Sequence, residues 1–304
     1  MKYIENESGR KESEIILGCM RIADMKECDL DTLIRTALEN GINIFDLADI
    51  YGGGKSEMLF GEVMKTSPSL RDKIVVQSKC GIREERYDFS KEYILSSVDG
   101  ILQRLHTDHL DHLLLHRPDA LMEPEEVAEA FQTLHESGKV IEFGVSNMNS
   151  MQIELLSSAL KFPITSDQLQ LSCAHTPMID SGFHVNMADD AACMRAGSIM
   201  EYCRIKKITI QSWSSLQYGF FDGTFLGSPK YQKLNEVLQE IGDHYGISAG
   251  AAAIAWILRV PGRMQAVIGT TKPSRVKELA KAGDIRLTRE EWYKIYLSAG
   301  NVLP

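Results

Sequence analysis

Residues 41–57, GINIFDLADIYGGGKSE, decide how the rest of the chain is interpreted. The apolar residues that follow the helix-ending pair Asn40-Gly41 predict a buried strand. Asp46 ends this strand, and Tyr51 stands five positions later, directly before three glycines. A buried carboxylate without a partner costs free energy, so Asp46 requires a nearby donor or cation. The stretch therefore predicts a strand end at which polar side chains meet.

Two later strands supply the expected partners. The segment KIVVQSK ends at Lys79, and the segment DHLLLH ends at His116. In a (β/α)8 barrel the carboxyl ends of the parallel strands form the active-site face. We therefore expect Asp46, Tyr51, Lys79 and His116 to lie together on that face.

The alternation of strand and helix patterns predicts one α/β domain over residues 1–304. The predicted fold is a (β/α)8 TIM barrel with long loops over the C-terminal face and an extra C-terminal helix. A doubly wound open sheet is the alternative, less favoured because no GxGxxG follows the first strand. The expected strands cover residues 15–17, 42–46, 73–79, 113–116, 140–145, 165–169, 207–213 and 265–269.

Apolar periodicity and end signals predict the helices between these strands. Ser56 and Ser90 are expected N-caps, and Thr288 with Glu291 forms a capping box for the last helix. Segments 172–190 and 214–229 lack clear periodicity and are expected to be long loops over the strand ends. The other expected helices cover residues 30–38, 56–65, 91–105, 124–137, 151–160, 191–204, 230–245, 248–258 and 273–282.

The composition restricts the possible partners and surroundings. The net charge of -9 argues against a broad surface for nucleic acid or anionic membrane. The longest apolar run, residues 249–258, is too short to cross a bilayer, and the first residues lack the apolar core of a signal peptide. The six cysteines show no CxxC pair, so we expect reduced thiols in a cytoplasmic protein, with Cys80 notable for its place beside Lys79.

Several segments together resemble the ordered motifs of the aldo-keto reductases. They are FDLADIYGGGKSE, QSKCG, LLLHRPD, GKVIEFGVSN, the strand with Gln168 and VIGTTKPSRVKE, and they span Gly18 to about Glu278. The resemblance implies an NADP-dependent oxidoreductase that reduces an aldehyde or ketone to the alcohol, reversibly. The alternative is an NADP(H)-binding regulatory subunit without significant turnover, as some members of that family are.

The resemblance also implies a role for each of the four clustered residues. Tyr51 would be the general acid that protonates the carbonyl oxygen, and His116 would orient or polarise that oxygen. Lys79 would favour the phenolate, and Asp46 would hold and neutralise the ammonium. The alternative for Asp46 and Lys79 is an ordinary buried ion pair.

The same resemblance implies a nicotinamide cofactor, with NADP(H) preferred over NAD(H). Ser146, Asn147 and Gln168 would bind its carboxamide, although Asn147 also suits a helix cap. Trp213 would stack on the nicotinamide ring. The full implied cofactor-binding set is Gly18, Cys19, Met20, Ser146, Asn147, Gln168, Trp213, Ser214, Leu216, Gly269, Thr270, Lys272, Arg275 and Glu278.

The preference for NADP(H) depends on two cations after the last strand. Lys272 and Arg275 stand at the start of a helix, where a 2′-phosphate would bind, while Glu278 would meet the adenine. A solvated helix face is the alternative for the two cations. The expected substrate is a small carbonyl compound, with Met20, Pro118 and the two long loops as cavity walls, and the chain is expected to be a monomer or weak homo-oligomer.

Two other interpretations of the motifs are disfavoured. The histidines at positions 106, 109, 112 and 116 lack an acidic or cysteine ligand at a zinc-site spacing, so neither a metal site nor a metal-dependent hydrolase is expected. The segment GGGKSE lacks the spacing of GxxxxGK[ST], and its glycines are instead expected to turn the chain beside Tyr51.

Overall fold

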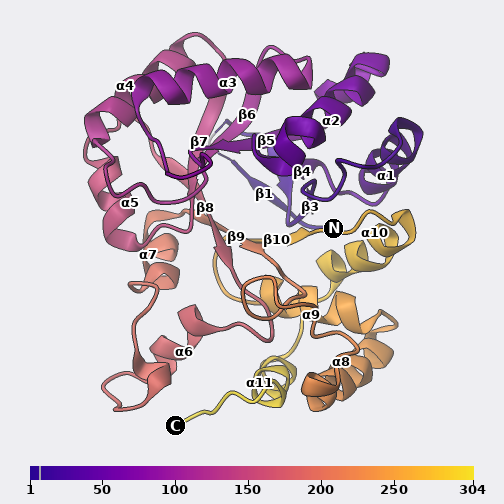
Figure 1. Cartoon of the computed structure of the whole chain (residues 1–304). Helices are drawn as coiled ribbons and strands as arrows, with labels where there is room; N and C mark the ends of the chain where they lie inside the picture. Colours follow the sequence, from indigo (N-terminus) through magenta and orange to yellow (C-terminus); the bar gives the residue numbers. More distant parts are fainter. Residues whose placement is uncertain (7) are drawn as a thin grey trace.

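Eight parallel strands close into a barrel in the computed structural model, which describes residues 1–6 and 8–304 (Figure 1). Strand β10 pairs with β3 and completes the ring, so the expected TIM barrel is confirmed. The strands are β3 (Ile15–Gly18), β4 (Ile44–Asp46), β5 (Val75–Cys80), β6 (Leu110–Leu115), β7 (Val140–Ser146), β8 (Ile164–Gln170), β9 (Thr209–Trp213) and β10 (Met264–Ile268).

Helices surround the barrel and bury apolar stripes against it (Figure 1). The first helix shows the pattern, because Leu30, Leu33, Ile34 and Ala37 share one buried face. The helices are α1 (Glu27–Glu39), α2 (Lys55–Thr66), α3 (Lys91–Leu105), α4 (Pro124–Glu136), α5 (Ser150–Ser157), α6 (Pro177–Phe183), α7 (Ile199–Lys206), α8 (Gln232–Tyr245), α9 (Ala249–Leu258), α10 (Pro273–Ala280) and α11 (Arg289–Ser298). Within the described residues, none of them combines the length and apolarity that crossing a membrane requires.

The C-terminal helix α11 begins at the expected capping box of Thr288 and Glu291. It packs against α9 through a pair of stacked indole rings. The rings of Trp256 and Trp292 lie 5.0 Å apart and 9° from parallel. Each indole N–H donates to the backbone carbonyl of the other tryptophan, at 3.0 and 3.1 Å. The extra helix is therefore a fixed part of the wall.

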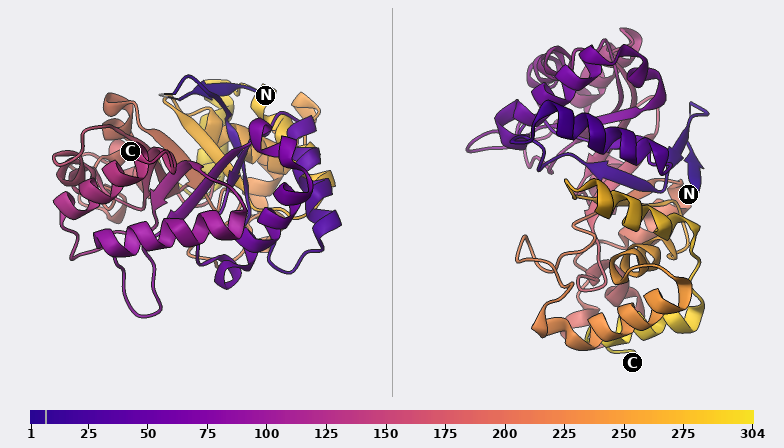
Figure 2. Two further views of the ribbon diagram at one scale, coloured as in Figure 1. Left: turned by 90° about the horizontal axis from the view of Figure 1, so that it is seen from above. Right: turned by 90° about the vertical axis from the view of Figure 1, so that its right-hand side faces the viewer.

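A hairpin of β1 (Tyr3–Glu5) and β2 (Lys11–Ser13), not predicted from the sequence, covers the end of the barrel at which the strands begin (Figure 2). Ser13 exchanges hydrogen bonds with Asn43, just before β4, and accepts one from Gln265 of β10. The hairpin thus closes the floor of the barrel, opposite the face where the active site was expected.

Two expected helix caps are wrong, and the third, Ser90, is confirmed in position only. Ser56 does not cap α2, because Gly54 adopts a left-handed φ of 87° at the cap position and the helix begins at Lys55. Asn147 does not cap α5, since Asn149 forms that capping box with Gln152. Ser90 occupies the N-cap position of α3 but makes no capping bond, and its hydroxyl donates to Asp88 instead.

The segment between β8 and β9 also departs from the expectation. The helix expected over 191–204 begins only at Ile199, because Gly197 and Ser198 have left-handed φ of 59° and 56°. The expected loop 172–190 contains α6, which starts at Pro177 in the first-turn position that proline favours. The helical turns in this segment are short, so their buried apolar residues do not repeat often enough for a helical period to be recognised in the sequence.

On the floor of the barrel, the His112 side chain of β6 is hydrogen-bonded to one acid and lies close to a second. Its Nε2 lies 2.5 Å from Glu12 Oε1, and its Nδ1 lies 3.8 Å from Glu142 Oε2. Burial alone would lower the pKa of His112, but attraction to Glu12 and Glu142 raises it to about 9. The imidazolium therefore joins the hairpin to two strands at neutral pH.

This pairing predicts a loss of stability at alkaline pH. His112 keeps its proton up to about pH 9 when folded but loses it near 6.5 when unfolded, so its stabilisation is complete below pH 6.5 and disappears as pH rises through 9. We expect the free energy of unfolding to fall by a few kcal/mol over that range. Urea unfolding at several pH values measures it. His112→Gln should flatten the dependence and the exposed His106→Gln should not; equal slopes in all three proteins would contradict the assignment.

Candidate active site

The four expected catalytic side chains do converge at the carboxyl ends of the strands. Asp46 is the last residue of β4, Lys79 lies in β5 and His116 follows β6 directly. Tyr51 comes five residues after Asp46 and begins a tight 3-10 turn, Tyr51–Gly54, which keeps it close to the end of β4. The three glycines of this turn have φ of 59°, 65° and 87°. The expected turn of the chain beside Tyr51 is therefore confirmed, and its glycines adopt the left-handed conformations that it needs.

Lys79 is the centre of this group and is completely buried. Its Nζ lies 2.7 Å from Asp46 Oδ1 and donates to the backbone carbonyl of Leu47 at 2.8 Å. It also donates to Tyr51 Oη at 3.0 Å. All three ammonium hydrogens therefore have acceptors, and Tyr51 receives one of them, which leaves its own O–H free to donate elsewhere.

Burial keeps Tyr51 a protonated phenol. Burial raises the pKa of Tyr51 above its ordinary value, and the nearby Lys79 only partly offsets this. Burial lowers the pKa of Lys79, but Asp46 and Tyr51 together raise it above its ordinary value, so the ammonium persists. The expected attraction of Lys79 for a phenolate is present, yet in this site burial outweighs it.

His116 lies edge-on to the phenol. The ring centroids of Tyr51 and His116 are 5.9 Å apart, with the planes at 80°. Burial, then the charges of Lys79 and Arg117, hold the pKa of His116 well below its usual range, so the imidazole is neutral. Its Nδ1 is buried and has no hydrogen-bond partner among the described residues.

A layer of glutamines inside the barrel supports Asp46, and of these only Gln168 was singled out from the sequence. Gln77 and Gln168 donate to Asp46 Oδ1 at 2.6 and 3.1 Å. Gln211 exchanges hydrogen bonds with Gln77 and donates to Gln265, which in turn reaches the hairpin. A glutamine within each apolar strand pattern, as in KIVVQSK and KITIQSW, was the available signal.

Above these residues opens a cavity of about 840 Å³. Asp46, Tyr51 and His116 line it, while Lys79 lies buried behind Tyr51. Lining residues that the sequence analysis missed include Arg21, Ile50, Ile82, Tyr87, Arg117, Phe220 and Phe221. The expected cofactor-binding residues that line it are Gly18, Met20, Ser146, Asn147, Gln168, Trp213, Ser214, Leu216, Gly269, Thr270, Arg275 and Glu278.

Two expected cofactor residues and two expected walls do not line the cavity. The Cys19 side chain is buried among apolar residues, and Lys272 is exposed at the start of α10. Pro118 and the segment 172–190 are also absent from the lining, and their place is taken by the loop after β5, through Ile82 and Tyr87. The backbone at Gly18 lies close to Val267 of β10, whose Cγ1 would lie 2.8 Å from an added Cβ.

Polar side chains beside the catalytic group are held by one another. Asn147, with a left-handed φ of 60°, accepts from Trp213 Nε1 at 3.1 Å and donates to Ser146 Oγ at 2.7 Å. Ser146 Oγ donates to the backbone carbonyl of Gln168 at 2.9 Å. The indole of Trp213 is thus fixed in the cavity wall by the expected amide-binding residues.

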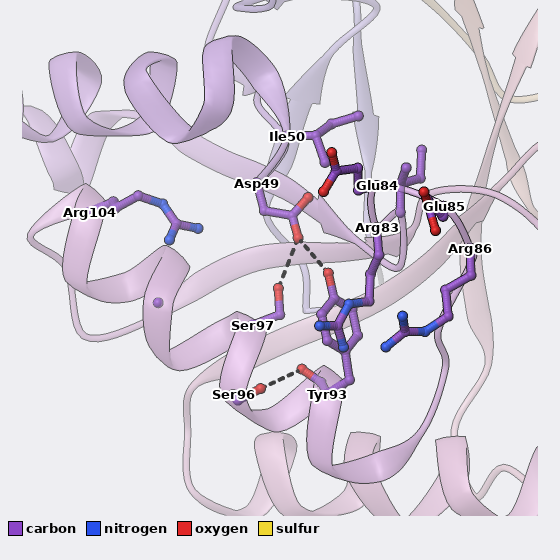
Figure 3. Close-up of a pocket in the computed structure, with 12 residues that line it drawn as sticks. Asp49, Ile50, Arg83, Glu84, Glu85, Arg86, Tyr93, Ser96, Ser97 and Arg104 are labelled. Atoms are coloured by element: carbon purple, nitrogen blue, oxygen red, sulfur yellow. Dashed lines mark hydrogen bonds between the residues drawn. The ribbon is translucent and has the colours of Figure 1, made fainter.

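A second cavity of about 550 Å³ adjoins the first, and Figure 3 shows the residues that line it. The two cavities share Ile50 and Ile82 in their walls. In the second, Asp49 accepts from Ser97 at 3.0 Å and Tyr93 at 3.3 Å, and burial raises the pKa of Asp49 to about 6. Burial and Asp49 raise the pKa of Cys80 well above its ordinary value, so this buried thiol is protonated and unreactive.

The chain is similar to known proteins over nearly its whole length. A model described as the aldo/keto reductase family matches residues 14–296. The chain is 34% identical to oxidoreductase YdhF of Escherichia coli (strain K12), covering 96% of this chain and 95% of that protein. It is 35% identical to a 6-dehydroglucose reductase of Agrobacterium fabrum, covering 94% of each.

Solved structures share the barrel. A thermostable aldo-keto reductase with the inhibitor epalrestat superposes with a TM-score of 0.78 at 24% identity, covering 98% of this chain and all of that one. An aldo-keto reductase from Klebsiella pneumoniae, in complex with NADPH, gives 0.76 at 20% identity, covering 97% and 93%. At these identities the structures establish the fold.

The chain belongs to the aldo/keto reductase family. It is an oxidoreductase that acts on CH–OH groups and binds a nicotinamide cofactor. The cavity has the chemistry that such a dinucleotide needs. Amide and hydroxyl groups and the Trp213 ring line it, together with Arg275 from α10.

The buried ion pair gives a prediction about stability. Lys79→Met leaves Asp46 buried without its cation and should lower the free energy of unfolding by about 3–5 kcal/mol. Adding Asp46→Asn removes the stranded charge and should recover part of that loss. Urea unfolding provides the measurement, with the exposed Lys277→Met as the control for loss of a lysine charge. A loss at Lys79 no larger than the control's would contradict the pairing.

Proposed function

We propose that the protein reduces an aldehyde or ketone to the alcohol with NADPH, and that the reaction is reversible. The observation that carries the proposal is the hydrogen bond from Lys79 to Tyr51, with Asp46 behind it and His116 beside it, at the wall of a large cavity. A single domain of residues 1–304, acting in the cytoplasm as a monomer or weak homo-oligomer, is part of this proposal.

Tyr51 is the proposed general acid. The reduced nicotinamide supplies the hydride pair to the carbonyl carbon when it is bound. As the C=O π pair moves onto oxygen, that oxygen takes the Tyr51 proton, for which the phenol is poised because Lys79 already occupies its acceptor side. The Lys79 ammonium then stabilises the phenolate that remains, and Asp46 keeps the ammonium in place. Solvent returns the proton.

His116 is proposed to fix the position of the carbonyl oxygen. Because its imidazole is neutral, it can donate one hydrogen bond without itself releasing a proton to the substrate. This separates the two roles: His116 orients and Tyr51 protonates. In the reverse direction Tyr51 would first release its proton to solvent, and the phenolate held by Lys79 would then accept the proton of the alcohol.

The expected preference for NADPH over NADH remains a proposal supported by Arg275. Arg275 lines the cavity on α10, and the exposed Lys272 stands one position before the helix begins. Two cations near a helix N-terminus suit a 2′-phosphate. Ser146, Asn147 and Gln168 would bind the carboxamide, and Trp213 would stack on the ring.

Loss of the Tyr51 hydroxyl should abolish turnover without abolishing cofactor binding. Tyr51→Phe removes the proton donor, and we expect kcat to fall at least ~100-fold while the Kd for NADPH changes little. Initial NADPH consumption with a panel of aldehydes, one of them a sugar aldehyde in view of the 6-dehydroglucose reductase relative, and fluorescence titration of NADPH measure the two quantities. Tyr245→Phe removes a remote hydroxyl and is the control.

The result also separates enzyme from regulatory subunit. Tight NADPH binding by the unaltered protein, with no carbonyl compound reduced, would favour the regulatory alternative. Turnover that survives Tyr51→Phe would instead remove Tyr51 from its proposed role.

The cofactor preference has its own test. Lys272→Ala combined with Arg275→Ala should raise KM for NADPH at least ~10-fold, because the 2′-phosphate loses two cations, and should leave KM for NADH nearly unchanged. Steady-state kinetics with both cofactors measure this. Lys277→Ala removes another exposed cation of α10 and serves as the control; equal effects on both cofactors would show that these residues do not read the phosphate.

A further inference from the structure

Arg117 is a cation of the catalytic cavity that the proposed mechanism does not use. It follows His116 directly and lines the same cavity. Its guanidinium carbon lies 5.7 Å from the ring centroid of Trp213 and 5.6 Å from that of Phe220. The two rings are nearly perpendicular, at 87°, so Arg117 occupies the corner between them.

No described residue gives this guanidinium an acceptor. Arg117 makes neither a hydrogen bond nor an ion pair within residues 1–6 and 8–304, although its side chain is half-buried. Contact with aromatic faces stabilises the charge but leaves the five N–H donors, which point outward in the guanidinium plane, without partners. The donors are therefore available to whatever enters the cavity.

The surrounding charges favour an anion. Among the described lining residues only Asp46 and Glu278 carry carboxylates; Asp46 is committed to Lys79, and Glu278 lies with Arg275 on α10. Arg21, which has no ion-pair partner in the described part of the chain, adds another cation to the lining. Arg117 lines the cavity directly beside His116, and its charge adds to burial and to Lys79 in lowering the pKa of His116.

We propose that Arg117 binds an anionic oxygen group of the substrate, so that the preferred substrates are short aldehydo or keto acids. A carboxylate matches the planar fork of a guanidinium, and the adjacency of His116 and Arg117 places it a few bonds from the carbonyl. This rests on the proposed carbonyl reduction. A phosphate of the dinucleotide would offer the same chemistry, and the experiment separates the two sources.

The test compares 4-formylbenzoate with its neutral isostere 4-formylbenzamide at saturating NADPH. The unaltered enzyme should prefer the carboxylate at least ~10-fold in kcat/KM. Arg117→Met keeps an unbranched stem against the rings and should lower kcat/KM for 4-formylbenzoate ~10–100-fold, mainly through KM, with less than about threefold change for the amide. Arg117→Lys should fall between, and Lys230→Met, which removes a cation stacked on Tyr218 outside the cavity, is the control.

Each other outcome overturns the proposal in a recognisable way. Equal losses for both aldehydes would make Arg117 a support for the Trp213–Phe220 corner. A raised KM for NADPH with unchanged aldehyde selectivity would assign it to the cofactor phosphate. An unaltered enzyme that reduces both aldehydes equally would remove the substrate class while the proposed function stands.

A binding measurement keeps the proposal testable if no aldehyde is reduced, the outcome that would overturn the proposed function. Calorimetric titration with benzoate and benzamide, in the presence of NADP+, should show benzoate binding that Arg117→Met weakens at least ~10-fold. Absence of benzoate binding, or binding that Arg117→Met does not change, would overturn the anion site itself.

Discussion

The buried ion pair between Lys79 and Asp46 is the constraint on which the rest of the site depends. An ammonium with no exposure to solvent is tolerable only when each of its hydrogens has an acceptor. Those acceptors come from the end of β4, from the backbone that follows it and from Tyr51. Pairing the charge therefore also fixes the distance between the phenol and the barrel. The glycine turn after Tyr51 lets the chain meet that requirement without strain.

Polar side chains inside the barrel support this ion pair from below. The glutamines beneath Asp46 fill a volume that barrels commonly fill with branched apolar side chains. Their amides can donate and accept at once, so Asp46 is held by neutral groups that do not compete with Lys79 for its charge. Below them, His112 joins the hairpin to β6 and β7 through two acids. Polar contacts thus run from the floor of the barrel to the catalytic face.

The sequence predicted the barrel because apolar residues recur with strand and helix periods. It predicted the convergence of Asp46, Tyr51, Lys79 and His116 because these residues stand at or just after the ends of parallel strands. It failed where structure depends on contacts between distant segments. The hairpin pairs with residues far along the chain, and the break at Gly197 and Ser198 is a matter of backbone conformation. Likewise, Pro118 adjoins the catalytic group in sequence yet does not line the cavity, whereas Phe220, a hundred residues away, packs against Arg117. Neighbouring residues in the sequence show where a strand ends, but the packing of distant loops determines which residues line the cavity.

The three tryptophans lie in two distinct settings, and this makes the protein its own optical probe. Trp256 and Trp292 are stacked between α9 and α11, with Trp256 wholly screened from water, and should emit at short wavelength until those helices separate. Trp213 stands alone in the cavity wall, so its emission reports what occupies that space. A Trp213→Phe background would isolate the helix pair, and the difference spectrum would isolate the cavity. Local opening of the mouth and detachment of the last helix could then be timed separately in the same sample.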